Sequence, residues 1–254
     1  MTISGFASFG MILSIMANSA TGKGDPCPDN IHHRTKPGPN GWAKQMAVTD
    51  MRLIGMLDSP YVRRVAISLR MLEMEFVHEP LSVFSAFEAF AAVNPVVKAP
   101  SLVTDDGVVL MDSSLILQHA ERLAAPGRSL MPSDPEGHTR SLRIIGLALA
   151  ACEKSVQIVY EHNLRPPERQ HQPWLDRVHA QVTAAYRMLE AEMPQTDVWI
   201  FGTRPMQADI TSAVAARFTR EMLPDVLSAE KFPRLCGLSE RAEVTDAFRA
   251  FPFS

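Results

Sequence analysis

The sequence predicts an α/β domain with a mixed four-stranded sheet, followed by a second domain made only of helices. Two observations carry this prediction. From Arg52 to about Ala124, short apolar runs alternate with apolar residues at three- and four-residue spacing, in the order β-α-β-α-β-β-α. Beyond a linker that contains Pro and Gly, helical spacing continues to the end of the chain with almost no strand signal.

The first half of the α/β domain is predicted to form a parallel pair of strands. Residues 52–57 are a short apolar run typical of a buried strand, and residues 76–81 are the second strand. Between them, residues 61–72 show the apolar spacing of a helix. A short helix over 85–93 ends at Asn94-Pro95.

The second half is predicted to be an antiparallel hairpin with a closing helix. The strands 101–103 and 108–110 flank residues 104–107, whose Asp-Gly pair is typical of a tight turn. A helix then begins at Asp112-Ser113 and runs to about residue 124. A parallel pair and an antiparallel hairpin together make one mixed sheet.

We divide the folded part into an α/β domain at 51–125, a linker at 126–134 and a helical domain at 135–254. The residues Ser133-Asp134-Pro135-Glu136 predict a helix start with a capping box. The expected helices are one long helix broken at 163–167, one around Trp174 to Leu189, one over 207–222, and shorter ones at the end. Only Val198-Trp199-Ile200 keeps a strand signal.

Residues 1–50 differ in composition from the rest. Residues 6–16 are an apolar run too short to span a bilayer, and small residues follow it. This pattern is like a signal peptide, but no Lys or Arg precedes it. Residues 21–45 are rich in Gly, Pro, Asn and Lys, which disfavours a packed core. We expect 1–50 to be a disordered extension or upstream sequence outside the real protein, with export as the less favoured alternative.

Charge and cysteine usage exclude several function classes. A formal net charge of -3 gives no basic field for nucleic acid, and no membrane partner is expected. The three cysteines are odd in number and far apart, which fits neither a disulfide framework nor a zinc site. We therefore expect a cytoplasmic protein. The histidines lack metal-ligand spacing, so no metal is expected.

Ser59 stands between a predicted strand and a predicted helix, directly before Pro60. One interpretation is a plain N-cap with proline at the first helical position. The other uses the same geometry for binding, because a helix N-terminus favours an anion and a hydroxyl there donates to a bound thiolate. The motif alone leaves both interpretations open.

Two further motifs lie at the starts of elements. Pro100 leads directly into a strand, so it starts that strand or sits in a turn, and a cis Ala99-Pro100 bond would expose the Ala99 backbone to a ligand. Asp112-Ser113 opens a helix, either as a cap or as a binding site. There the Ser113 hydroxyl and N–H suit a carboxylate, and Asp112 suits an ammonium group.

Taken together in this order, these motifs resemble the glutathione S-transferase superfamily, from Arg52 to about Ala250. The resemblance is strongest to the bacterial branch with an S-P-[FY]-V-R-[KR] first motif. It implies a thioredoxin-like glutathione-binding domain, an all-helical second domain and a homodimer. The matching residues are Ser59-Pro60-Tyr61-Val62-Arg63-Arg64, Asn94-Pro95-x-x-Lys98-Ala99-Pro100-x-Leu102, Asp112-Ser113-x-x-Ile116, Leu130-Met131-Pro132-Ser133-Asp134-Pro135 and Ala208-Asp209-Ile210.

The resemblance also implies roles for individual residues. Ser59 would hold and activate the glutathione sulfur. Ala99, before a cis Pro100, would pair its backbone with the cysteinyl backbone, and Lys98 would reach the glycyl carboxylate. The γ-glutamyl head would be held by two residues, Asp112 and Ser113.

Four residues depart from the family pattern. Asp58 precedes Ser59, and its charge would oppose a thiolate unless the side chain points away. Val97 stands where the family often has Gly, and Ala99 where it often has Val. Met206 stands at the N-cap before Asp209, where the family has Ser or Thr, so half of that capping box is absent.

Three residues are candidates for a second-substrate pocket, namely Tyr61 in the first helix and Cys152 and Tyr160 in the long helix of the second domain. Ordinary core packing is the alternative for each of them.

The resemblance implies a detoxifying transferase that conjugates glutathione thiolate to an electrophilic small molecule. One alternative is another glutathione-dependent activity, as an isomerase, dehalogenase or peroxidase. The maleylacetoacetate isomerase branch has Ser-Ser-Cys where this chain has Leu57-Asp58-Ser59, which argues against that activity. The other alternative is a non-catalytic binding or regulatory protein of the same fold.

Overall fold

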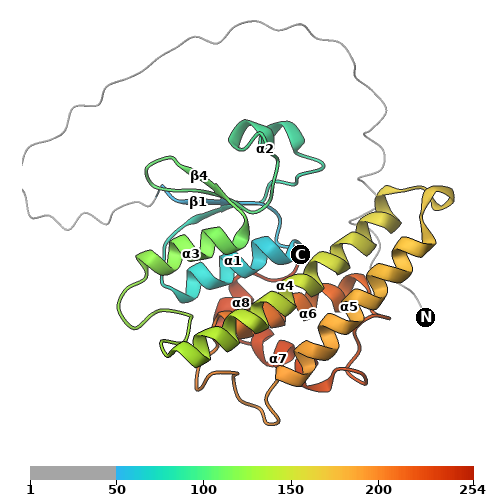
Figure 1. Cartoon of the computed structure of the whole chain (residues 1–254). Coiled ribbons are helices and arrows are strands. Elements are labelled where there is room, and N and C mark those ends of the chain that lie inside the picture. The colour runs from blue at the N-terminus through green and yellow to red at the C-terminus, as the bar shows by residue number, and fades with distance from the viewer. Residues whose placement is uncertain (1–49) are drawn as a thin grey trace, which may run out of the picture. The chain divides into compact units, whose positions relative to one another are not determined.

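The computed structural model describes residues 50–254, which belong to one compact unit. Apart from residue 50, the extension predicted over residues 1–50 lies outside the described residues, and so does its signal-like run. The rest of the chain has the predicted architecture, with a mixed sheet first and helices after it (Figure 1).

The sheet has four strands in the order β2-β1-β3-β4. They are β1 (Arg52–Ile54), β2 (Val77–Glu79), β3 (Ser101–Val103) and β4 (Val109–Met111). β1 runs parallel to β2 and antiparallel to β3, and β3 runs antiparallel to β4. The predicted mixed sheet is therefore confirmed. Leu53 and Leu102 lie opposite each other at the centre and are fully buried.

Two helices cover one side of the sheet and a short helix lies on the other (Figure 1). They are α1 (Pro60–Met71), α3 (Ser113–Leu123) and, on the far side, α2 (Phe87–Val93). α1 has Ser59 as its N-cap and proline at its first position, two features that favour a helix start. Val62, Val65 and Leu69 bury the apolar face of α1.

The second half is helical. Its helices are α4 (Pro135–Leu164), α5 (Gln172–Glu192), α6 (Gln207–Met222), α7 (Pro233–Glu243) and α8 (Asp246–Ala250), with a short 3-10 turn η1 (Pro167–Arg169) after α4. α6 packs on both α4 and α1. It therefore joins the helical half to the helix that carries Ser59.

Two local predictions are corrected. The N-cap of α4 is Asp134, whose Oδ1 accepts the Gly137 N–H at 2.7 Å, and not Ser133 as the capping-box pattern predicted. Pro135 explains the difference, because it takes the first helical position and leaves the residue before it as the cap. The strand signal at 198–200 forms only an isolated bridge between Trp199 and Gly202.

The core around α1 is built from both halves of the chain. Sheet and α1 residues such as Leu53 and Val62 share one cluster of buried side chains with Ile210, Val214 and Phe248 from α6 and α8. The linker predicted at 126–134 therefore separates the two domains in the sequence, but the buried cluster around α1 contains side chains from both domains.

The start of α6 is held by a buried carboxylate. Asp209 accepts the Ile200 N–H through Oδ1 and the Met206 N–H through Oδ2, both at 2.9 Å. Burial raises the pKa of Asp209, while these N–H donors act to lower it. Although Met206 has no hydroxyl, the Asp209 half of the capping arrangement is present.

Candidate functional site

The Ser59 hydroxyl lies at the N-terminus of α1, where β1 has ended. Its Oγ accepts the Val62 N–H at 3.5 Å, which is long for a hydrogen bond, and the side chain is half-buried. The helix uses only a lone pair of this oxygen. The hydroxyl proton thus remains able to donate. The backbone N–H groups at the N-terminus of α1 favour negative charge at the same place.

Asp58 shares the surroundings of Ser59. Its side chain is half-buried, and burial raises the pKa of this carboxyl group, while the Ser59 backbone N–H lowers it. The pKa of Tyr160 is raised by burial and then by the charge of Asp58. Asp58 therefore acts electrostatically on Tyr160, and it adjoins Ser59 in the chain.

The loop before β3 places Ala99 against the end of β1. The Ala99–Pro100 peptide bond is cis. Gly55, at φ +138°, leaves room for this contact, since a Cβ there would lie 3.2 Å from the Ala99 Cβ and 2.6 Å from Val62 Cγ2. A side chain at Gly55 would therefore push the loop away from α1.

Buried hydrogen bonds fix the same loop from within. Ser101 Oγ donates to the Lys98 carbonyl and accepts from Asn94 Nδ2, both at 2.8 Å. Lys98 itself is exposed, and Val97 has φ +51°. Although Val97 stands where the family often has glycine, the loop takes the left-handed backbone angle for which glycine is the usual residue.

Asp112 and Ser113 open α3. Asp112 has φ +71° and is the N-cap, with its Oδ1 accepting the Ser114 N–H at 2.9 Å. Ser113 is 4% exposed, and its Oγ accepts a hydrogen bond from Arg64 Nη1 at 2.9 Å. As at Ser59, the oxygen is an acceptor inside the protein, so its proton remains able to donate to a ligand.

Arg64 is the polar residue of this region that the sequence analysis assigned no role. It is 2% exposed, and Nη1 also reaches Ser114 Oγ at 3.2 Å. Burial lowers the pKa of Arg64 to about 10, and Cys152, Asp112 and Tyr61 raise it, so the group is charged at neutral pH. The available signal was its place at the end of the S-P-Y-V-R-R motif.

The three second-substrate candidates have different surroundings. Tyr61 packs against the core of the helical half, and burial raises its pKa. Cys152 is 2% exposed, and burial raises its thiol pKa to about 12, so it is protonated at neutral pH. Tyr160 is 44% exposed and meets Phe84 edge-to-face, with ring centroids 5.7 Å apart. A ligand from solvent would reach Tyr160 before Cys152.

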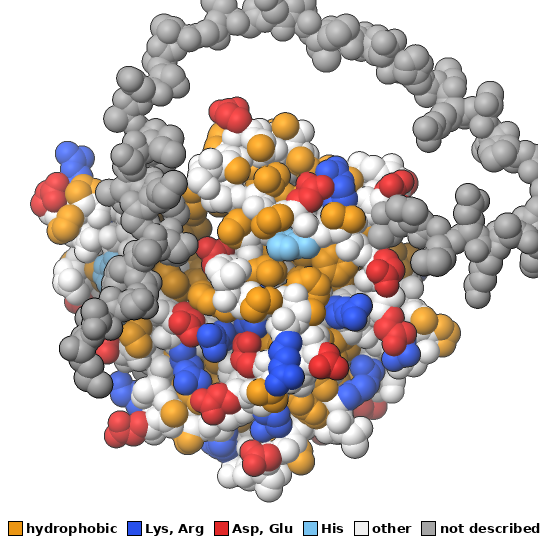
Figure 2. Space-filling model, turned by 180° about the vertical axis from the view of Figure 1, so that it is seen from behind, with side chains coloured by type: hydrophobic (Ala, Val, Ile, Leu, Met, Phe, Trp, Pro, Cys, Tyr) orange, Lys and Arg blue, Asp and Glu red, His pale blue; other side chains and the backbone are white. Residues whose placement is uncertain are grey.

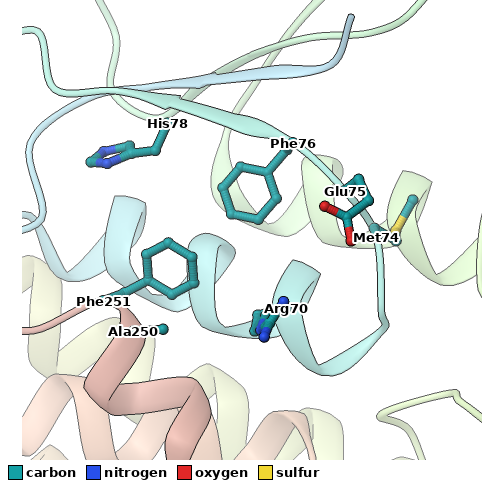
Figure 3. A pocket seen from close by; sticks show the side chains of 7 residues that line it. All are labelled: Arg70, Met74, Glu75, Phe76, His78, Ala250 and Phe251. Carbon is teal, nitrogen blue, oxygen red and sulfur yellow. The ribbon is translucent and has the colours of Figure 1, made fainter. Parts of the chain in front are cut away.

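An open pocket of about 200 Å³ lies elsewhere, near the C-terminal end of α1 (Figure 3). None of the predicted site residues lines it. Two of its aromatic rings stack on each other with centroids 5.6 Å apart. Its lining residues are Arg70, Met74, Glu75, Phe76, His78, Ala250 and Phe251.

Residues 50–254 contain no group of three or more His, Cys, Asp or Glu side chains placed to hold a metal ion. Within the same residues, no helix has the length and apolar character needed to cross a membrane. Figure 2 shows acidic and basic side chains intermingled on one face of the molecule.

Comparison with known proteins identifies the family. Residues 53–128 match the family model for the glutathione S-transferase N-terminal domain. Residues 172–237 match the model for the glutathione S-transferase C-terminal domain. The Escherichia coli (strain K12) protein YibF, an uncharacterized GST-like protein, is 31% identical over 143 residues, which are 55% of this chain and 68% of that protein. This chain belongs to the glutathione S-transferase family. The family predicted from the motifs is thus confirmed.

Two longer matches cover both halves of this family member. A solved glutathione S-transferase from Methylobacterium radiotolerans, in complex with glutathione sulfonate, has 26% sequence identity and a TM-score of 0.74. That match covers 80% of this chain and 95% of the other. Maleylacetoacetate isomerase from Pseudomonas aeruginosa is 24% identical over 214 residues, which are 78% of this chain and 94% of that enzyme.

Proposed function

We propose that this family member is a glutathione transferase that conjugates the glutathione thiolate to an electrophilic small molecule. The observation that carries the proposal is the Ser59 hydroxyl, which lies at the N-terminus of α1 with its proton available to donate. A similar protein with 26% identity has been solved with glutathione sulfonate, which supports a glutathione site on this scaffold.

In this mechanism Ser59 and the N-terminus of α1 stabilise the glutathione sulfur as a thiolate. Lowering a thiol pKa from about 8.5 toward 6.5 raises the thiolate fraction at neutral pH from a few per cent to most of the bound ligand. The thiolate lone pair then forms a C–S bond to the electrophilic carbon. A leaving group departs with its bonding electrons, or an added proton neutralises the carbanion.

The remaining predicted residues match the charges of glutathione. Lys98 would meet the glycyl carboxylate, and the Ala99 backbone would pair with the cysteinyl residue. Asp112 would meet the ammonium group, and Ser113 the second carboxylate. A ligand with two carboxylates and one ammonium group would thus find a partner for each charge. We also propose that the protein is a cytoplasmic homodimer. The family resemblance that implies these residue roles also implies the dimer.

A second candidate is glutathione-dependent isomerisation. It is supported by the similarity to Pseudomonas aeruginosa maleylacetoacetate isomerase, which extends over 94% of that enzyme. Leu57-Asp58-Ser59 stands where that branch has Ser-Ser-Cys, and we therefore rank isomerisation below conjugation.

The test starts with glutathione binding to the full chain. We expect retention on glutathione-agarose and the ultraviolet absorbance of a bound thiolate at neutral pH. A panel of electrophiles and a maleylacetoacetate-type cis-trans substrate then separate conjugation from isomerisation. Binding without thiolate absorbance and without turnover would overturn the proposal in favour of a non-catalytic binding protein.

A further inference from the structure

Arg64 is a buried cation. Among residues 50–254, its guanidinium donates to two hydroxyl oxygens and to no carboxylate: Ser113 Oγ lies at 2.9 Å and Ser114 Oγ at 3.2 Å. Its Nε is buried and has no hydrogen-bond partner among residues 50–254. A buried guanidinium is normally paired with an anion, so this arrangement requires an explanation.

The hydrogen bond from Arg64 determines how Ser113 can act. A guanidinium has donors and no acceptor, so Ser113 Oγ must receive this bond through a lone pair. The Ser113 hydroxyl proton cannot point back at Arg64. It must therefore be directed to another acceptor.

The same guanidinium adds charge at the start of α3. Ser113 and Ser114 are the first two residues of that helix, where backbone N–H groups already favour an anion. Asp112 at the N-cap supplies the opposite charge and acts electrostatically on Arg64. A ligand group carrying both a carboxylate and an ammonium would complement this pair of charges.

We propose that Arg64 is a positioning residue for the γ-glutamyl carboxylate of glutathione. It fixes the Ser113 hydroxyl so that its proton faces that carboxylate, and it places a positive charge behind the N-terminus of α3. This inference rests on the proposed function, because it requires glutathione at the site. Arg64 is buried and is not among the residues predicted to touch the ligand. Through Ser113, it favours ligands that carry the γ-glutamyl carboxylate.

The experiment compares two ligands that differ only at this carboxylate. The first is glutathione, and the second is 4-aminobutanoyl-Cys-Gly, which lacks the α-carboxylate of the γ-glutamyl residue. Calorimetry measures the affinity of both for the wild type, Arg64→Met and Arg64→Lys. Arg122→Met, which removes an exposed cation from the last turn of α3, is the matched control.

We expect Arg64→Met to weaken glutathione binding about tenfold or more, as for a lost charge-assisted contact. Its affinity for 4-aminobutanoyl-Cys-Gly should change less than about twofold, because the contact that Arg64 supports is missing from that ligand. Arg64→Lys keeps the charge but loses the planar guanidinium, so its loss should be smaller and again confined to glutathione. Arg122→Met should bind both ligands like the wild type.

Equal losses for the two ligands would overturn the inference, since a merely structural role weakens both. If Arg64→Met does not fold, Arg64→Lys is the deciding variant. An Arg64→Lys variant that binds both ligands with wild-type affinity would then also overturn the inference. A wild type that binds neither ligand would instead refute the proposed function, so the two failures are distinguishable.

Discussion

The two sides of α1 use the same residue type in different ways. On one side, Arg63 donates to both carboxylate oxygens of Glu243, at 2.7 and 2.6 Å, and to the Phe251 carbonyl at 2.8 Å. On the other side, Arg64 donates to hydroxyl groups of α3 and to no other group in the described part of the chain. Both residues are buried. Removal of a fully paired buried cation leaves its partner uncompensated and destabilises the fold, whereas an incompletely paired buried cation is available to a ligand.

The largest expected effect is on the Arg63 side. Arg63→Met should lower the free energy of unfolding by about 3–5 kcal/mol, because it leaves Glu243 and the Phe251 carbonyl without their partner. Urea denaturation measures this loss. Arg64→Met, the matched change one residue along, should cost no more than about 1 kcal/mol since it leaves no carboxylate unpaired. Similar losses in the two variants would contradict the contrast between the two sides.

The next effect is on ligand affinity at α3. Ser113→Ala should raise the glutathione KM roughly tenfold or more, because a charge-assisted contact of about 1.5–3 kcal/mol is lost. Its kcat at saturating glutathione should change little, since Ser113 would contact the end of the ligand farthest from the sulfur. Steady-state kinetics separates the two parameters. An unchanged KM would mean that Ser113 only accepts the Arg64 hydrogen bond.

A smaller effect is expected at the sulfur itself. Ser59→Ala should raise the pKa of the bound glutathione thiol by about one unit, near 1.4 kcal/mol, while the N-terminus of α1 continues to favour the thiolate. Ultraviolet titration of the complex measures this shift, and Ser114→Ala is the control that should leave it unchanged. Superimposable titrations with equal kcat would place the chemistry elsewhere, with Tyr61 the first residue to examine.

The smallest effect concerns Asp58. Burial raises its pKa above the ordinary value of 3.8, so the native state binds this proton more tightly than the unfolded chain. Wild-type stability therefore falls as pH rises from 3.8 through the raised pKa. Asp58→Asn has no such proton, so its free energy of unfolding should rise relative to that of the wild type between pH 3.8 and the raised pKa. Above the raised pKa, the difference between the two proteins should stay constant. Urea denaturation at several pH values tests this sign.

Asp58→Asn should also lower the bound thiol pKa slightly, because a negative charge near Ser59 is removed. Tyr160→Phe is a matched control, since it removes the other polar group that responds to Asp58 without changing a charge. A rise in the thiol pKa of Asp58→Asn would contradict this electrostatic interpretation.

Local signals explain what the sequence could predict. The Asp-Gly pair before Val108 and the proline after Ala99 mark turns through their own backbone preferences, and they supported the predicted hairpin of the mixed sheet. The start of α4 carried two signals: Pro135 favours Asp134 as the residue before it, whereas the capping-box spacing favours Ser133.

Residues far apart in the chain explain what the sequence could not predict. Arg63 and Arg64 are indistinguishable by type, and the partner of Arg63 lies 180 residues away. Cys152 and Tyr160 lie on one helix, yet one is buried and the other is 44% exposed. Their surroundings depend on which elements pack against α4, and the apolar spacing within α4 does not contain that information.

The shared core around α1 bears on how the chain is synthesised. The sheet, Ser59 and α3 leave the ribosome first, but Ile210, Val214 and Phe248, which complete the same core, are translated much later. Glu243, the partner of Arg63, also comes near the end of translation. A nascent chain that contains every predicted glutathione-contacting residue therefore still lacks the packing that holds α1 in place. We therefore expect the proposed glutathione site to become competent to bind only after the last helices are released.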